Sequence, residues 1–106
     1  MPVMSTVAPL SILSAIVPLG SLLEDWSLLE GSGQRTFRHP IVFERPFLAP
    51  PVVHLGIVGI DASKHDNLRV RVRPEAIGTA GFTVVVETWL HTQLWAVDVS
   101  WMAIGS

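Results

Sequence analysis

The chain has no cysteine among its 106 residues. Disulfide bonds and a cysteine nucleophile are therefore excluded, and cysteine usage gives no information about the redox state of the compartment. The length is enough for one domain with one hydrophobic core and too short for two.

Charged residues are also scarce, at 15% of the chain against about 25% in a typical soluble domain. Because apolar residues make up 49%, we expect part of the apolar surface to be covered by another copy of the chain. The net charge is −2, so no overall field attracts nucleic acid, and we expect no nucleic-acid partner.

No apolar run is long enough to cross a bilayer. Residues 1–29 are largely apolar, but Pro9 and Pro18 divide them into pieces shorter than the ~20 residues that a spanning helix needs. No lysine or arginine precedes Arg35, as a signal peptide would require. We expect neither a signal peptide nor membrane insertion, and interpret residues 1–21 as an apolar arm or a strand packed on a neighbour.

Motifs for catalysis and metal binding are missing as well. None of the histidines lies two or four positions from another, so the usual zinc spacings are absent. There is no G-x-S-x-G motif, and no carboxylate pair is brought together by the sequence. We expect a protein that is not an enzyme and needs no metal or cofactor. The histidines are His39, His54, His65 and His91.

The C-terminal quarter reads as two strands, residues 82–88 and 94–103, joined by a loop of hairpin length at residues 90–93. The second strand alternates, so one set of residues is predicted to share a face. This set is Trp95, Val97, Val99 and Trp101, with Trp101 expected in the core.

Further strands are predicted at residues 41–43, at 52–60, buried on both faces, and at 68–73. In the last, Leu68, Val70 and Val72 would point inward and arginines outward. Ser21-x-x-Glu24 matches a capping box, which predicts a short helix over 22–29, with a strand as the alternative. Five or six short strands with regular turns indicate an antiparallel β-sandwich.

Two tryptophans, Trp89 and Trp95, flank the 90–93 loop. An indole ring beside polar groups suits a sugar, because the apolar face of a pyranose packs on the ring while its hydroxyls form hydrogen bonds. An arginine nearby would suit hydroxyl recognition, since its donors form a fixed fork. The alternative is that both rings lie in the core or at an interface between copies of the chain.

An ordered set of residues resembles the H-type lectin domain over roughly residues 40–104. The matching positions are Phe43-x-x-Pro46-Phe47, Pro50-Pro51-Val52-Val53, Asp61, Asn67-Leu68-Arg69-Val70, Gly81-Phe82, Thr88-Trp89, Thr92 and Val99-Ser100-Trp101. The resemblance implies an all-β, six-stranded antiparallel β-sandwich that forms trimers, sometimes hexamers. It also implies non-catalytic binding of terminal galactose or N-acetylgalactosamine, and a secreted or extracellular location.

By this resemblance, Arg69 would donate to sugar hydroxyls, and Trp89 and Trp95 would form the apolar wall of the site. Secondary polar contacts would come from Ser32, His91 and Thr92. Residues 26–106 would be the lectin-like domain, and residues 1–25, which match poorly, an oligomerisation or attachment segment.

Two positions depart from the family pattern. Leu90 stands where the snail lectin has histidine, and the early loop carries Ser32 where an aspartate is expected. The alternative function is therefore a structural trimerisation or attachment module without a working sugar site.

Overall fold

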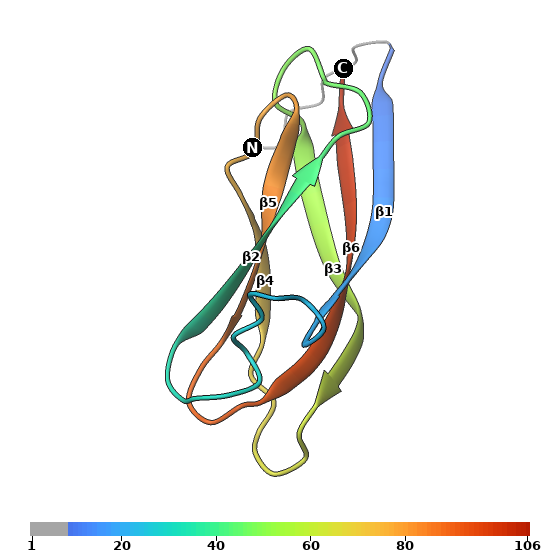
Figure 1. The fold of residues 1–106 in the computed structure, drawn as a ribbon. Coiled ribbons are helices and arrows are strands. Elements are labelled where there is room, and N and C mark those ends of the chain that lie inside the picture. The colour runs from blue at the N-terminus through green and yellow to red at the C-terminus, as the bar shows by residue number, and fades with distance from the viewer. Residues whose placement is uncertain (1–8) are drawn as a thin grey trace, which may run out of the picture.

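The computed structural model describes residues 9–106, which form two three-stranded antiparallel sheets (Figure 1). One sheet has the strand order β1-β6-β3 and the other β2-β5-β4. This confirms the predicted six-stranded antiparallel β-sandwich. Residues 1–8 of the predicted N-terminal segment lie outside the described part. The strands are β1 (Ser11–Gly20), β2 (Arg35–Val42), β3 (Val52–Ala62), β4 (Arg71–Glu75), β5 (Gly81–Thr88) and β6 (Leu94–Gly105).

The core lies between the inner faces of the two sheets. β5 and β6 are the central strands, and their inward valines at positions 84, 86, 97 and 99 are fully buried. Trp101 is 8% exposed, which confirms its predicted place in the core. It joins an aromatic cluster whose ring centroids lie 5.2–5.9 Å apart, at distances typical of favourable aromatic pairs. The cluster consists of Phe43, Phe47, Phe82 and Trp101.

The predicted helix over 22–29 is wrong, and no helix occurs in residues 9–106. The backbone N–H of Ser21 donates to the carbonyl of Trp95 (2.9 Å), which extends the contact between β1 and β6 into a turn. Leu22 is fully exposed, whereas Leu28 is fully buried. Sandwich packing therefore overrides the local capping signal.

A β-bulge in β6 changes the face of the sheet on which Trp95 lies. Asp61 pairs with Ala96, but the next residue of β3, Ala62, pairs with Leu94, so β6 has one extra residue, Trp95. As a result Leu94 is fully buried, while Trp95 is 47% exposed. The prediction that Trp95 shares a face with the buried residues of β6 is therefore wrong.

Three other strand predictions need correction. β2 starts at residue 35 rather than 41. β3 is not buried on both faces, because Val52 and Val58 are 73% and 56% exposed. β4 begins at residue 71 rather than 68, and Leu68, predicted to point inward, is 53% exposed.

Candidate functional site

Three loops meet at one end of the sandwich, the lower end in Figure 1. They join β1 to β2, β3 to β4 and β5 to β6. The backbone N–H of Gly33 donates to the carbonyl of Leu90 (2.8 Å), and that of Ser63 donates to the carbonyl of Gln93 (2.9 Å). The β5–β6 loop, predicted at residues 90–93 and observed at 89–93, is thus held on both sides by its neighbours.

Arg35, the first residue of β2, fixes two of these loops in place. Its Nη2 donates to the carbonyls of Leu90 (3.0 Å) and Thr92 (2.8 Å). Its Nε and Nη1 donate to the carbonyls of Gly33 (3.1 Å) and Glu30 (3.1 Å), with a longer bond to the carbonyl of residue 28. The sequence analysis missed this residue, because no local pattern shows that a lone arginine will bond carbonyls from two distant loops.

The side chain of Arg69 is 19% exposed and held by one of its nitrogens. Nη1 donates to Thr92 Oγ1 (3.2 Å), to the carbonyl of Asn67 (3.4 Å) and to Asp66 Oδ1 (3.4 Å). The backbone N–H of Asn67 also donates to Asp66 Oδ1. This bond, followed by that from Arg69, lowers the pKa of Asp66 below its ordinary value, and the nearby His91 acts in the same direction. The guanidinium is thus oriented at Nη1, with Nε and Nη2 as further donors.

Two threonines of the family pattern form hydrogen bonds with Arg69. Thr92 is 2% exposed, and its hydroxyl donates to the carbonyl of Asn67 (2.6 Å) while accepting from Arg69. Thr88 is fully buried, and its hydroxyl donates to the carbonyl of Arg69 itself (2.5 Å). The structure therefore places Thr92 behind the arginine rather than at the surface.

Trp89 follows β5 directly and is half-buried. The guanidinium carbon of Arg71 lies 5.2 Å from the centre of its ring, within the range of a cation–π contact. Arg71 pairs with Glu87 at the end of the β4–β5 register, and just beyond it the hydroxyl of Thr88 donates to the carbonyl of Arg69. Arg69 and Trp89 therefore each lie just beyond the paired residues of β4 and β5, at the loop end of the sandwich.

Ser32 and His91 are both exposed and lie on neighbouring loops. Ser32 stands between Gly31 and Gly33, whose φ angles of +80° and +79° are accessible to glycine without strain. Leu90 has a φ of +56°, which is unfavourable for a side chain of this kind, and it is 52% exposed. The Ser32 loop is therefore docked against the turn that carries His91.

Trp95 lies elsewhere, because of the bulge in β6. It lines a groove of about 360 Å³ on the β1-β6-β3 sheet, together with Pro18, Leu22 and Asp61. Trp89 instead contacts Arg71 of the other sheet. The structure thus does not bring Trp89 and Trp95 together as one wall.

A row of ion pairs covers the outer face of the β2-β5-β4 sheet. Arg38 pairs with Glu75 (3.2 Å), Arg73 with Glu75 (3.1 Å) and with Glu87 (2.6 Å), and Arg71 with Glu87 (3.8 Å). The bond from Arg73 is the main cause that lowers the pKa of Glu87 below its ordinary value; Arg38 does the same for Glu75. The predicted outward arginines of β4 are therefore ion-pair partners in this row.

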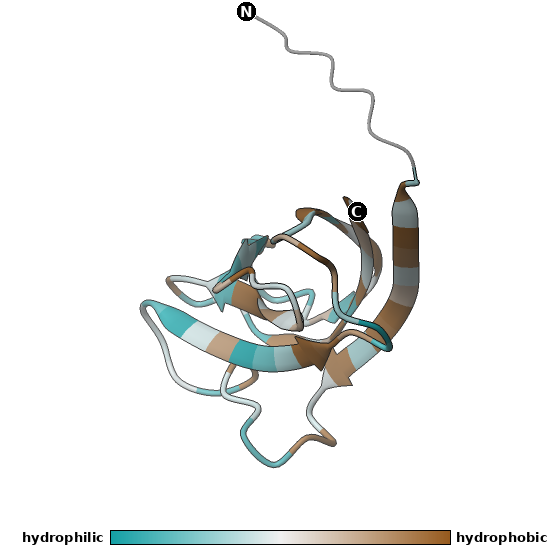
Figure 2. Cartoon of the chain, turned by 90° about the horizontal axis from the view of Figure 1, so that it is seen from above, coloured by the Kyte–Doolittle hydropathy of each residue, from teal (hydrophilic) through white to brown (hydrophobic). Residues whose placement is uncertain are grey.

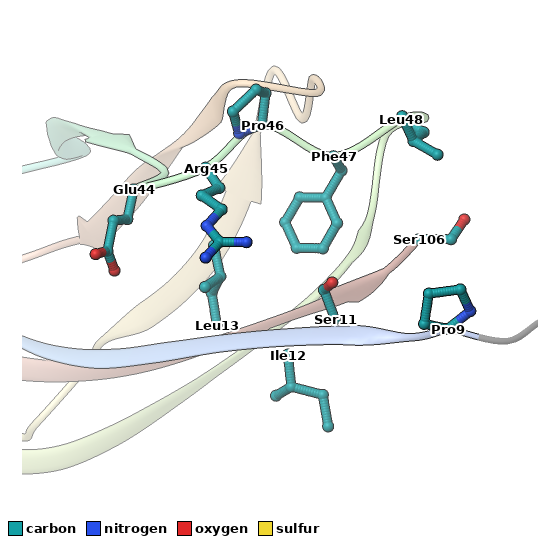
Figure 3. Close-up of a pocket in the computed structure, with 10 residues that line it drawn as sticks. All are labelled: Pro9, Ser11, Ile12, Leu13, Glu44, Arg45, Pro46, Phe47, Leu48 and Ser106. Atoms are coloured by element: carbon teal, nitrogen blue, oxygen red, sulfur yellow. The ribbon is translucent and has the colours of Figure 1, made fainter.

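The opposite end of the sandwich has a separate hollow of about 630 Å³, beside β1 (Figure 3). Arg45 and Phe47 extend from the loop after β2 toward β1, and Ile12 points away on its far side. None of the predicted site residues lines this hollow. In residues 9–106, no group of three or more metal-ligating side chains gathers, and no helix of membrane-spanning length is found.

Two known proteins are similar to this chain in sequence. A protein of Fuscovulum blasticum described as ATP synthase subunits region ORF 7 is 36% identical over 76 residues, covering 72% of this chain and 66% of that protein. One of the discoidin-1 polypeptides of Dictyostelium discoideum is 31% identical over 81 residues, covering 76% of this chain and 32% of that one. The chain thus spans less than two thirds of either relative's length.

The solved structure of discoidin II from Dictyostelium discoideum superimposes with a TM-score of 0.82 and 25% identity, covering 96% of this chain and 39% of that one. The match covers nearly the whole chain, so β1 is included in the shared fold. Residues 38–104 match the H-type lectin domain, which includes Arg69 and Trp89. The chain therefore belongs to the H-type lectin domain family, a family of carbohydrate-binding modules.

Proposed function

We propose that this lectin module recognises terminal galactose or N-acetylgalactosamine-type sugars, and that it does so as a multivalent oligomer. The observation that carries the proposal is the oriented guanidinium of Arg69, whose carbonyl is bonded to Thr88, the residue next to Trp89. Sugar hydroxyls would accept from Nε and Nη2, while an apolar C–H face of the sugar would contact the indole ring. Because Nη1 is already held by protein acceptors, little side-chain entropy is lost when the sugar binds.

The remaining predicted residues divide into two groups. Ser32 and His91 are exposed on loops beside the turn at Leu90, so they would supply the secondary polar contacts. Thr92 would act by orienting Arg69, since its hydroxyl is already engaged twice. Trp95 would contribute from its own groove on the other sheet rather than beside Trp89.

Self-association would use the outer face of the β1-β6-β3 sheet. This face exposes several large apolar side chains. Figure 2 shows that apolar residues, coloured brown, recur along β1. An exposed apolar face of this kind is typical of a protein interface. We propose a trimer built on this face, with a hexamer formed when two trimers pair, so that weak single sites gain avidity. The exposed residues are Ile12, Ile16, Val52, Val58 and Met102.

A structural trimerisation module without a working sugar site is the second candidate. It is favoured by Leu90 and Ser32, which remove two polar groups expected from the family. In that case the apolar sheet face would be the functional surface, and Arg69 would only hold the β3–β4 loop.

The deciding experiment measures binding of the purified chain to surfaces coated with galactose and N-acetylgalactosamine. We expect Arg69→Ala to abolish binding while light scattering shows the same particle mass. Arg45→Ala is the matched control, because Arg45 is an exposed arginine at the other end of the sandwich. Binding to neither surface, from a chain that forms a clean trimer, would favour the structural module.

A further inference from the structure

The ion-pair row on the β2-β5-β4 sheet is unbalanced in charge. Its members alternate in the order Arg38, Glu75, Arg73, Glu87 and Arg71. Three arginines face two glutamates, so the row carries one surplus positive charge. An alternating row that begins and ends on arginine leaves its least neutralised charge at one of the two ends.

Arg71 is the end with the weaker partner. Its Nη2 lies 3.8 Å from Glu87, whereas Arg38 approaches Glu75 to 3.2 Å with a second bond at 3.5 Å. Glu87 is already occupied, because it accepts from Arg73 at 2.6 Å and from Gln34 at 3.2 Å. The surplus charge of the row therefore falls mainly on Arg71.

The position of Arg71 places this charge at the proposed sugar site. Its side chain is 58% exposed, and its guanidinium lies over the ring of Trp89, 5.2 Å from the centre. Arg69 stands two residues earlier in the chain, and its carbonyl accepts from the hydroxyl of Thr88, next to Trp89. One guanidinium thus lies over the indole ring, and the backbone of a second arginine is bonded to the residue that precedes this tryptophan.

The acidic groups nearby do not cancel this charge. Asp66 is bonded to Arg69 and to the backbone of Asn67. The loop over residues 31–33, where the family pattern has an aspartate, contains only glycine and serine. Residues 31–33 thus lack a carboxylate that would repel an anion.

We infer that the site prefers an acidic saccharide, a galactose-type sugar that carries a carboxylate or sulfate group, with Arg71 as the residue that selects it. This inference rests on the proposed function, since it assigns a substituent to the same sugar. The anionic group would pair with Arg71 while the ring hydroxyls bond to Arg69. Charge-assisted hydrogen bonds are roughly twice as strong as neutral ones, so the preference is measurable.

The test compares three immobilised probes: neutral galactose, galacturonate and galactose 6-sulfate. We expect the wild-type chain to bind at least one acidic probe about tenfold more tightly than the neutral one. The preference should weaken as salt is raised, because the pair at Arg71 is solvent-exposed. The better acidic probe identifies whether carboxylate or sulfate is the preferred group.

Three variants separate charge selection from structural effects. Arg71→Gln should lose the acidic preference but keep binding to neutral galactose, and Arg71→Lys should keep most of the preference. Arg38→Gln, at the other end of the same row, should leave it unchanged. Equal binding of all three probes by the wild-type chain would overturn this inference but not the proposed function. Equal effects of Arg71→Gln and Arg38→Gln on the acidic preference would do the same. No binding to any probe would overturn the proposed function with it.

Discussion

At the loop end of the sandwich, the backbone of Leu90 is strained. Leu90 adopts a positive φ and is half exposed, so its side chain adds backbone strain and little burial. We expect Leu90→Gly to raise the free energy of unfolding by up to about 1 kcal/mol, because glycine adopts this conformation without strain. Urea unfolding at neutral pH measures the change.

Gly33→Ala is the matched control for that variant, since Gly33 also has a positive φ, on the loop facing Leu90. No atom lies within 4 Å of the position that a Cβ would take at Gly33, so any effect of the alanine comes from the backbone conformation. We expect it to lower stability by about 1–2 kcal/mol. If Leu90→Gly and Gly33→Ala changed the free energy of unfolding in the same direction, the positive φ angles would not be the cause, and the prediction would be contradicted.

Arg35 shows how a single side chain can set the geometry of a site that it does not enter. We expect Arg35→Ala to lower the free energy of unfolding by about 2 kcal/mol, because several carbonyls lose a charged donor. Sugar binding should weaken as well, since the Ser32 loop and the β5–β6 loop would separate. Arg35→Lys should rescue little, because an ammonium cannot reproduce the fork of donors. Full stability of Arg35→Ala would contradict this role.

At the scale of the strands, the outer face of the β2-β5-β4 sheet makes the fold sensitive to acid. The pKa values of Glu75 and Glu87 in the folded chain lie below their ordinary value of 4.5. A depressed pKa means that the ionised carboxylate stabilises the fold above the ordinary value and loses this effect as the pH falls through the folded value. We therefore expect stability to fall below about pH 4.5, by urea unfolding over a pH series.

The variant Glu87→Gln tests the source of that dependence. It should be less stable at neutral pH and should show a flatter decline in acid, because one of the titrating groups is gone. Glu44→Gln, at an exposed carboxylate in the loop after β2, should leave the curve unchanged. An unchanged curve for Glu87→Gln would show that the decline has another origin.

Alternation and turn residues were enough to predict the sandwich and the closing pair of strands, because inward positions repeat every second residue. They failed at Trp95, since a bulge is set by pairing with β3 rather than by the sequence of β6. The helix prediction failed because the turn after β1 bonds to the same distant strand. At the site, Arg69 and Trp89 were predicted from the family pattern, whereas Arg35 and Arg71 became apparent only from contacts across strands.

For the whole molecule, the exposed apolar face of the β1-β6-β3 sheet implies association. We expect the wild-type chain to run as a trimer in light scattering, and Ile16→Glu to dissociate it, because a buried charge without a partner opposes assembly. Val42→Glu is the matched control, since Val42 is an exposed apolar residue at the end of β2 in the other sheet. A monomeric wild-type chain would contradict the proposed interface.

The two ends of the sandwich differ in their suitability for attaching the protein to a support or a label. The carboxyl end of the described chain lies at the pole opposite the three loops, and the carbonyl of Ser106 is bonded to the backbone of Leu48 (2.7 Å). A sensor chip or a fluorescent label attached there would leave Arg69 and Trp89 facing the solution. Tethering through the β3–β4 loop would turn the same residues toward the support, so the choice of anchor alone decides whether the site can be sampled.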